Sequence, residues 1–431
     1  MAQKPFPRYK IILFNCVYLF ISFSFIVGVL ELYVRYRIYR KGDHLVEIDP
    51  GYYAELQKKN PIAAFPYPLY ILDMKYGWRF TPNNQGTSKD LRAHPEPEYK
   101  TKVKINSSGF RSSQEYSAED KGFKIAVLGD SFVQGLQVEE EETFVKVAER
   151  NLQAQDLPVK IYNFGVGGWG TVSEYRMFYD EVLKIHPQMV IVAFTNTDLT
   201  DNSPYYPHDY NFLFPRYTKT PAGGFNLSDF NFSPPEHRLI TPPFSEKTIR
   251  DSLVYDAWAN KFKFLEGTVQ FLKVIPYLRY VLAPVKDYYF AFDIHRKQYP
   301  AALEESLWFT MSLLSELNQY CKNQKIDFFV LLIPALEQLD RKEWDRYVWT
   351  RRSFLDAEDF DLDRPQSLLT KEFEKNSIPY LDLLAAFKKA RKERLYFSRD
   401  GHFNALGHRR TGEALTEHLL STVDLTKKSA N

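Results

Sequence analysis

Short, continuous apolar runs are the feature of this chain that most constrains its fold. Five of them occur in the sequence, each four to six residues long. Their hydrophobicity is continuous rather than alternating, which is typical of strands buried on both faces of a parallel sheet. The runs are Lys124–Leu128, Val159–Tyr162, Met189–Phe194, Phe328–Ile333 and Ile378–Leu381.

Helix-like segments lie between most of these runs. In segment 143–153, for example, Phe144 and Leu152 fall on the same helical face. Alternating strands and helices predict a doubly wound α/β domain with a parallel sheet. Three further segments are similarly amphipathic: 171–186, 301–323 and 405–421.

The N-terminus predicts a membrane anchor. The twenty residues Ile11–Leu30 contain no charge, and a helix of about twenty apolar residues matches the hydrocarbon core of a bilayer. A cleaved signal peptide is the alternative, but its apolar stretch is usually about 7–15 residues and ends at a small-x-small site, which is lacking here. We expect residues 1–41 to form an uncleaved anchor. Basic residues flank its apolar stretch on both sides: Lys4, Arg8, Lys10, Arg35, Arg37, Arg40 and Lys41.

The rest of the chain divides into an extension, a domain and an insertion. Residues 42–122 are polar and show little periodicity, so we expect a linker and an irregular N-terminal extension. The domain proper is predicted over 123–425, with an aromatic-rich insertion at about 203–300. A connection of this length is usually functional or disordered, and its Tyr and Phe content argues against disorder. It is expected to form either a cap beside the site or a surface for oligomer or membrane contact.

Composition excludes several classes of function. The formal net charge is +2, from 56 basic and 54 acidic residues, and no basic block with interleaved aromatics predicts nucleic-acid binding. The only cysteines are Cys16 and Cys321, which are too few for a thiol cage around a metal. We therefore expect no metal and no organic cofactor.

Polar clusters follow the predicted strands. Gly129-Asp130-Ser131 comes after the first, 163–170 after the second, 195–202 after the third and 400–404 beyond the last. The carboxyl ends of parallel strands share one edge of an open sheet, where ligands bind. Four clusters that are distant in sequence should therefore meet at one crevice.

The residue types in these clusters predict acyl chemistry. A serine hydroxyl needs a neighbouring base, and that base needs orientation; Ser131, His402 and Asp400 can fill these three roles. The oxyanion that forms requires preorganised donors. The candidates are the backbone N–H groups of Ser131 and Gly168 and a side chain at Asn196 or Thr197.

Each motif also has a less specific interpretation. Gly-Asp-Ser is a common turn sequence, and the glycine-rich loop lacks both the dinucleotide fingerprint and a P-loop lysine. A metallophosphoesterase is a further alternative, in which the metal ligands would be Asp130, Asp198, Asp400 and His402. The joint occurrence of four clusters, each after a strand, favours the serine site.

The clusters resemble the four blocks of the SGNH/GDSL hydrolase family. The matching segments are GDSF (129–132), NFGVGGWGT (163–171), FTNTDLTDN (194–202) and DGHFNALGH (400–408), with NSSGFR (106–111) upstream. The resemblance implies a flavodoxin-like three-layer α/β/α fold with Ser131, Gly168, Asp400 and His402 in the site. In the third block the family's usual Gly-x-Asn-Asp is replaced by Asn196-Thr197-Asp198. The Asp-x-His spacing is similar to that of the polysaccharide O-acetyltransferase branch.

The resulting hypothesis is serine-dependent ester hydrolysis or acyl transfer on a cell-envelope glycan or lipid, through an acyl-enzyme at Ser131. The resemblance places such a protein at a bacterial inner membrane, as a single-pass protein with an extracytoplasmic catalytic domain. The alternative is a non-catalytic glycan-binding assembly protein of the same fold.

Overall fold

The computed structural model describes residues 69–73, 75–89, 97–203, 213–232, 290–342, 344, 360–398 and 400–426, together with Tyr18, Leu19 and Ser22. The chain forms two compact units. One comprises Met1–Ile48, His237–Tyr288 and Thr350–Ser353, of which only Tyr18, Leu19 and Ser22 are described. All other described residues belong to the second unit, whose fold follows.

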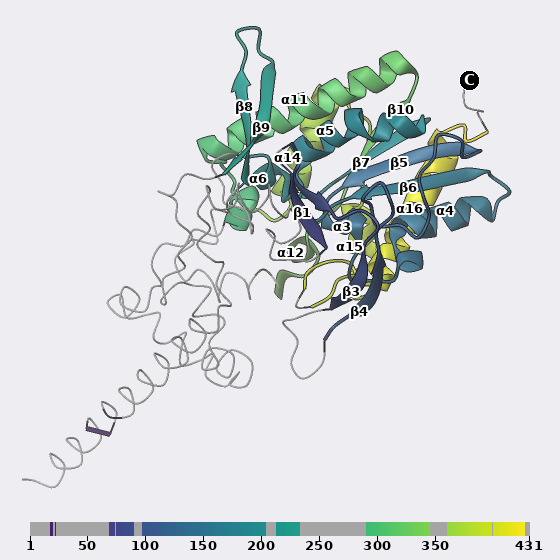
Figure 1. The fold of residues 1–431 in the computed structure, drawn as a ribbon. Coiled ribbons are helices and arrows are strands. Elements are labelled where there is room, and N and C mark those ends of the chain that lie inside the picture. The colour runs from purple at the N-terminus through teal and green to yellow at the C-terminus, as the bar shows by residue number, and fades with distance from the viewer. Residues whose placement is uncertain are drawn as a thin grey trace, which may run out of the picture. The chain divides into compact units, whose positions relative to one another are not determined.

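A parallel five-stranded sheet is the centre of this unit, as predicted (Figure 1). If the five sheet strands are numbered 1 to 5 along the chain, they lie side by side in the order 2-1-3-4-5, which is the flavodoxin-like order. Each strand overlaps one of the predicted apolar runs. In that order the strands are β6 (Val159–Gly165), β5 (Phe123–Gly129), β7 (Met189–Phe194), β10 (Asp327–Leu332) and β11 (Tyr380–Asp382).

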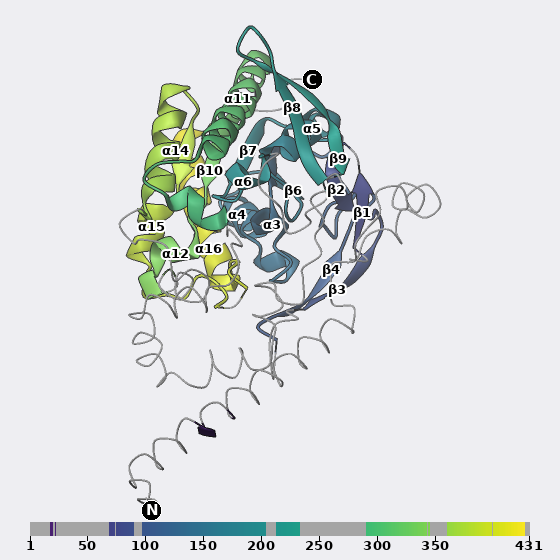
Figure 2. The same ribbon diagram turned by 90° about the vertical axis from the view of Figure 1, so that its left-hand side faces the viewer.

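Helices cover the sheet on both sides (Figure 2). On one side α4 (Phe144–Gln153) packs against α16 (Ala405–Thr422), and their apolar faces share a buried cluster with Ile125 and Val127 of β5. On the other side α5 (Thr171–Asp180) packs against α11 (Ala301–Gln324). The continuous apolar strands are therefore buried on both faces, because both faces are covered by helices.

The other helices of the described residues connect these layers or follow the strands. Five are α-helical: α3 (Ser131–Gln134), α6 (Asp198–Asp201), α12 (Leu336–Leu339), α14 (Arg364–Lys375) and α15 (Leu384–Lys389). Three are 3₁₀ helices: η2 (Glu140–Glu142), η3 (Val182–Ile185) and η6 (Phe290–His295).

The described part of the N-terminal extension is more regular than the sequence predicted. Strands β1 (Tyr70–Asp73) and β2 (Gly77–Phe80) pair antiparallel, as do β3 (Gln85–Lys89) and β4 (Lys100–Lys104). These strands have only four or five residues, and β3 is polar and mostly exposed, so apolar periodicity gave no signal for them. The indole of Trp78 in β2 donates to Gly167 O at 2.8 Å, which ties the extension to the glycine-rich loop.

The described part of the insertion contains a β-hairpin and the 3₁₀ helix η6 (Phe290–His295). Strands β8 (Leu213–Lys219) and β9 (Phe225–Phe232) pair antiparallel. The hairpin contacts α11, where Tyr217 stacks on Phe309 with ring centroids 3.7 Å apart. Residues 204–212 and 233–289 lie outside the described part, so the cap and the contact surface both remain predictions.

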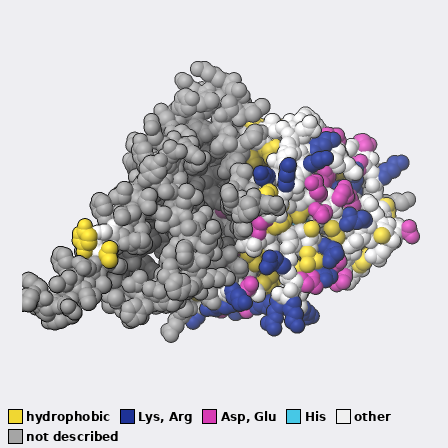
Figure 3. All heavy atoms as spheres, turned by 90° about the horizontal axis from the view of Figure 1, so that it is seen from below, with side chains coloured by type: hydrophobic (Ala, Val, Ile, Leu, Met, Phe, Trp, Pro, Cys, Tyr) yellow, Lys and Arg dark blue, Asp and Glu magenta, His cyan; other side chains and the backbone are white. Residues whose placement is uncertain are grey.

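The predicted anchor, residues 11–30, also lies outside the described part of the chain except for Tyr18, Leu19 and Ser22. Within the residues that the structure describes, no helix has the length and apolar character needed to span a bilayer. On the surface drawn in Figure 3, basic and acidic side chains of the described residues are interspersed.

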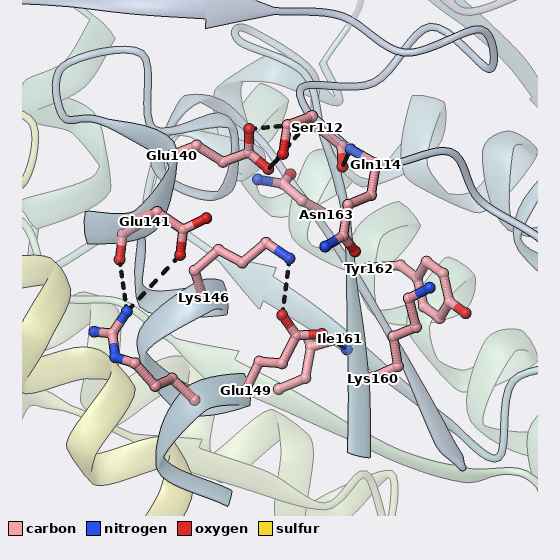
Figure 4. A network of polar contacts seen from close by, with 12 residues as sticks. Ser112, Gln114, Glu140, Glu141, Lys146, Glu149, Lys160, Ile161, Tyr162 and Asn163 are labelled. Atoms are coloured by element: carbon pink, nitrogen blue, oxygen red, sulfur yellow. Dashed lines mark hydrogen bonds and ion pairs between the residues drawn. The ribbon is translucent and has the colours of Figure 1, made fainter. Parts of the chain in front are cut away.

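Polar contacts fix α4 to the edge of the sheet (Figure 4). Lys146 Nζ lies 2.8 Å from Glu149 Oε2, and Glu149 Oε1 accepts the N–H of Ile161 in β6 at 2.9 Å. A cavity of about 10 Å³ beside this network is lined by Arg111, Glu140 and neighbouring residues. It has room for about one water molecule, so it is not a ligand site.

Candidate active site

The structure brings the hydroxyl of Ser131 to the imidazole of His402. Ser131 Oγ lies 2.7 Å from His402 Nε2, although the two residues are 271 positions apart. The other ring nitrogen, Nδ1, hydrogen-bonds Asp400 Oδ1. The His402 side chain is 27% exposed and that of Asp400 is 5% exposed. The Ser131–His402 pair is therefore open to a substrate, while the Asp400 carboxylate is shielded from water.

The short helix α3 positions Ser131 at the carboxyl end of β5. Asp130 caps this helix, because its Oδ1 accepts the N–H of Phe132 at 2.8 Å. At the other end the buried guanidinium of Arg111 donates to the carbonyls of Gln134 and Gly135, and to Val138 O at 2.6 Å. Burial lowers the pKa of Arg111 to about 10, which leaves it charged at neutral pH. Both ends of the nucleophile's helix are thus held by side chains.

A tight loop presents Asp400 and His402. Tyr396 and Phe403 form a β-bridge that closes the loop. Inside it, the N–H of Phe397 donates to His402 O at 2.9 Å, and the N–H of Gly401 donates to Phe397 O at 3.1 Å. These bonds place the Asp-x-His pair on one closed turn.

Aromatic rings pack beside the histidine. The ring of Phe132 lies 5.1 Å from that of His402 and meets Phe403 edge to face at 4.8 Å. The imidazole is therefore held by apolar contact as well as by its two polar partners.

The backbone N–H groups of Ser131 and Gly168 are the two predicted main-chain donors to an oxyanion. Within the described part of the chain, the N–H groups of Ser131 and Gly168 donate to no protein acceptor. Gly168 has φ of 77°, a left-handed conformation that favours glycine. A side chain at Gly165 is excluded as well, since a Cβ there would lie 2.4 Å from Gln134 N of α3. The glycine-rich loop can therefore approach the nucleophile's helix closely.

The third cluster, residues 195–202, contains Asn196 and Thr197, the two candidate side chains for the oxyanion hole. The amide of Asn196 is buried and donates to Gln338 Oε1 in α12 at 3.1 Å. Thr197 is exposed, and its hydroxyl lies 2.8 Å from that of Thr195. Asn196 is thus directed at α12, and of the two candidates only Thr197 is an exposed residue.

Buried acidic groups lie beneath the site. The hydroxyl of Thr195 contacts Asp130 Oδ2 at 2.9 Å and Asp198 Oδ2 at 3.2 Å. Burial raises the pKa of Asp130 to about 6 and, with the nearby Asp130 charge, raises the pKa of Asp198 well above its ordinary value. Burial also raises the pKa of Glu174 in α5, whose carboxyl oxygens have no hydrogen-bond partner among the described residues. This acidic cluster therefore retains protons at pH values where exposed carboxyls have lost theirs.

Among the described residues, no group of three or more His, Cys, Asp and Glu side chains is arranged to hold a metal ion. Asp130 and Asp198 meet at Thr195, while Asp400 and His402 pair with each other. The four residues that the phosphoesterase alternative required are thus divided between two sets of contacts.

Sequence reasoning missed three supporting residues. Arg111 stood in the upstream block without an assigned role, and Thr195 stood in the third block. Glu98 accepts the N–H of Asp400 at 3.0 Å from a segment with no periodicity. Nothing in the sequence pointed to Glu98, because its contact spans some three hundred residues.

Comparison with known proteins adds structural similarity only. No family model matches the chain, and no curated protein matches it either. An acetyl xylan esterase is 13% identical over 69% of this chain and 100% of its own, with a TM-score of 0.34. A lipase/acylhydrolase from Enterococcus faecalis is 12% identical over 71% and 99%, with a TM-score of 0.35. A catalytic mutant of an acetylxylan esterase from Geobacillus stearothermophilus is 12% identical over 71% and 97%, with a TM-score of 0.35. At these values the matches do not establish a family for the chain.

Proposed function

We propose that this chain is a serine esterase or O-acyltransferase of the SGNH/GDSL type. The observation that carries the proposal is the chain of contacts from Ser131 Oγ through both nitrogens of His402 to Asp400. Four sequence blocks that resemble that family supply the residues at this site.

In the proposed mechanism each group has a role. His402 Nε2 takes the proton of Ser131 as its oxygen attacks the acyl carbonyl, and Asp400 accepts the Nδ1–H and stabilises the imidazolium. The N–H groups of Ser131 and Gly168 stabilise the oxyanion. His402 then returns the proton to the departing alkoxide. Water or a sugar hydroxyl resolves the acyl-enzyme, which gives hydrolysis or transfer.

Labelling of the full-length chain by a fluorophosphonate probe tests this mechanism, since an activated serine reacts readily. Wild-type protein should be labelled and should hydrolyse p-nitrophenyl acetate, whereas Ser131→Ala should lose both properties. Ser421→Ala is the matched control, because Ser421 is an exposed serine on α16. Equal labelling of wild type and Ser131→Ala would rule the mechanism out.

The substrate is proposed to be an acyl group on a cell-envelope glycan or lipid. The apolar segment 11–30 supports this proposal, since an anchored enzyme would act at an extracytoplasmic membrane surface. Incubation with acetylated and deacetylated glycan tests it and separates esterase from transferase. Loss of acetate from the first indicates hydrolysis, and acetylation of the second by an activated donor indicates transfer.

One observation favours a second candidate, a non-catalytic glycan-binding protein. The amide of Asn196 is engaged by Gln338, so a third oxyanion donor would have to come from Thr197. Glycan binding by a wild-type protein that resists the fluorophosphonate would support this candidate.

A further inference from the structure

The carboxylate of Glu98 lies across the loop that carries Asp400 and His402. Its Oε2 accepts the N–H of Asp400 at 3.0 Å. Its Oε1 accepts both the N–H and the hydroxyl of Ser398, at 3.0 and 2.7 Å. Three donors of one turn thus converge on a single side chain that enters from the N-terminal extension, just before β4.

A second contact joins the same two segments. The ring of Tyr99 lies 5.4 Å from that of Phe397. Both residues therefore contact the loop. Glu98 accepts hydrogen bonds from Ser398 and Asp400, and the ring of Tyr99 packs beside that of Phe397. The strand β4, which begins two residues after Glu98, is paired with β3.

The loop's own bonds leave its tip to be fixed from outside. The bridge between Tyr396 and Phe403 and the bond from Gly401 N to Phe397 O close the turn. The N–H groups of Ser398 and Asp400 are instead satisfied by Glu98. The orientation of the Asp400 backbone determines where its carboxylate lies, so an acceptor on its N–H also controls the contact with His402.

We infer that Glu98 is a positioning residue for the acid–base pair, which holds Asp400 in register with His402. The inference rests on the proposed function and deepens it, because the extension becomes part of the catalytic apparatus. Glu98 acts through Asp400 and contacts no reacting atom.

Kinetics of the full-length chain with p-nitrophenyl acetate test this role. Glu98→Ala should lower kcat about 10- to 100-fold with little change in KM, since small misplacements of catalytic groups cost about that much. Glu98→Gln keeps one acceptor oxygen and should recover part of the loss. In an Asp400→Asn background, Glu98→Ala should add little, because residues that act through one contact are not additive.

Glu115→Ala is the matched control. Glu115 also accepts the N–H of a serine, Ser107, at 3.0 Å, and bonds that serine's hydroxyl, but on a turn without catalytic residues. The Glu115→Ala variant should leave kcat unchanged. The inference is overturned if Glu98→Ala retains wild-type kcat, if Glu115→Ala loses as much, or if the losses of Glu98→Ala and Asp400→Asn multiply.

Hydrogen exchange of the peptide spanning 397–403 provides a readout independent of activity. Glu98→Ala should accelerate its exchange, and Glu115→Ala should not. If the wild type resists fluorophosphonate, the proposed function fails, yet exchange still decides whether Glu98 holds the loop. Unchanged exchange in Glu98→Ala rejects the positioning role whatever the activity.

Discussion

A single imidazole joins the two halves of the candidate site at the scale of residues. His402 bonds Ser131 through Nε2 and Asp400 through Nδ1, so the proton on the ring is assigned to Nδ1 while Nε2 faces the hydroxyl. In that tautomer the base is ready to accept a proton. The carboxylate is the group that maintains it.

Asp400→Asn tests this assignment. An asparagine can present its NH₂ to Nδ1 and favour the wrong tautomer, so kcat should fall by about 10³- to 10⁴-fold while the fold is retained. Turnover of p-nitrophenyl acetate and circular dichroism measure the two effects. Asp424→Asn, which alters an exposed carboxylate near the C-terminus, is the control. Wild-type turnover in Asp400→Asn would remove Asp400 from the mechanism.

Helix α3 shows how a short element is stabilised from outside at the scale of secondary structure. Four residues make few internal hydrogen bonds, so the cap at Asp130 and the guanidinium of Arg111 provide the remaining contacts. Arg111 reaches three carbonyls with one planar group. A lysine ammonium has no comparable fork of donors.

Arg111→Lys should therefore destabilise the protein and slow the reaction of Ser131. Buried carbonyls left without donors cost about 1–3 kcal/mol, and we expect a loss of about 2 kcal/mol in the free energy of unfolding. Chemical denaturation and the rate of fluorophosphonate labelling measure both effects. Arg150→Lys on α4 is the control, since the Arg150 side chain is 58% exposed. If the two variants behave alike, Arg111 does not support α3.

The elements that could be predicted from the sequence are those with a repeating apolar pattern. The five sheet strands were predicted because burial on both faces requires continuous apolar residues. Strands β1–β4 were not, since they are short and β3 is largely exposed. Ser131 and His402 could be paired because Ser131 follows the first sheet strand and His402 lies beyond the last. The contacts of Asn196 with Gln338 and of Glu98 with Asp400 depend on packing between distant segments, which no local pattern encodes.

Burial of the Glu174 carboxyl in α5 has a consequence for the stability of the whole molecule. The carboxyl of Glu174 is fully buried, and its oxygens have no hydrogen-bond partner among the described residues. Its pKa is raised, first by burial and then by the charges of Asp198, Asp130 and Asp201. A folded-state pKa above the unfolded value, about 4.3 for glutamate, means that the folded protein binds the proton more tightly. The stability from this group is complete below about pH 4 and is lost as pH rises toward the folded-state value.

Glu174→Gln should remove this pH dependence. The neutral amide carries no ionisation penalty, so the variant should match the wild type near pH 4. It should exceed the wild type in free energy of unfolding by a margin that grows as pH rises above about 4, at up to about 1.4 kcal/mol per pH unit. Denaturation from pH 4.5 to 8 measures the difference. Glu181→Gln is the control, because Glu181 lies just beyond the end of α5 with its side chain 34% exposed. Parallel curves for Glu174→Gln and wild type would show that Glu174 ionises in the folded protein as readily as in the unfolded chain.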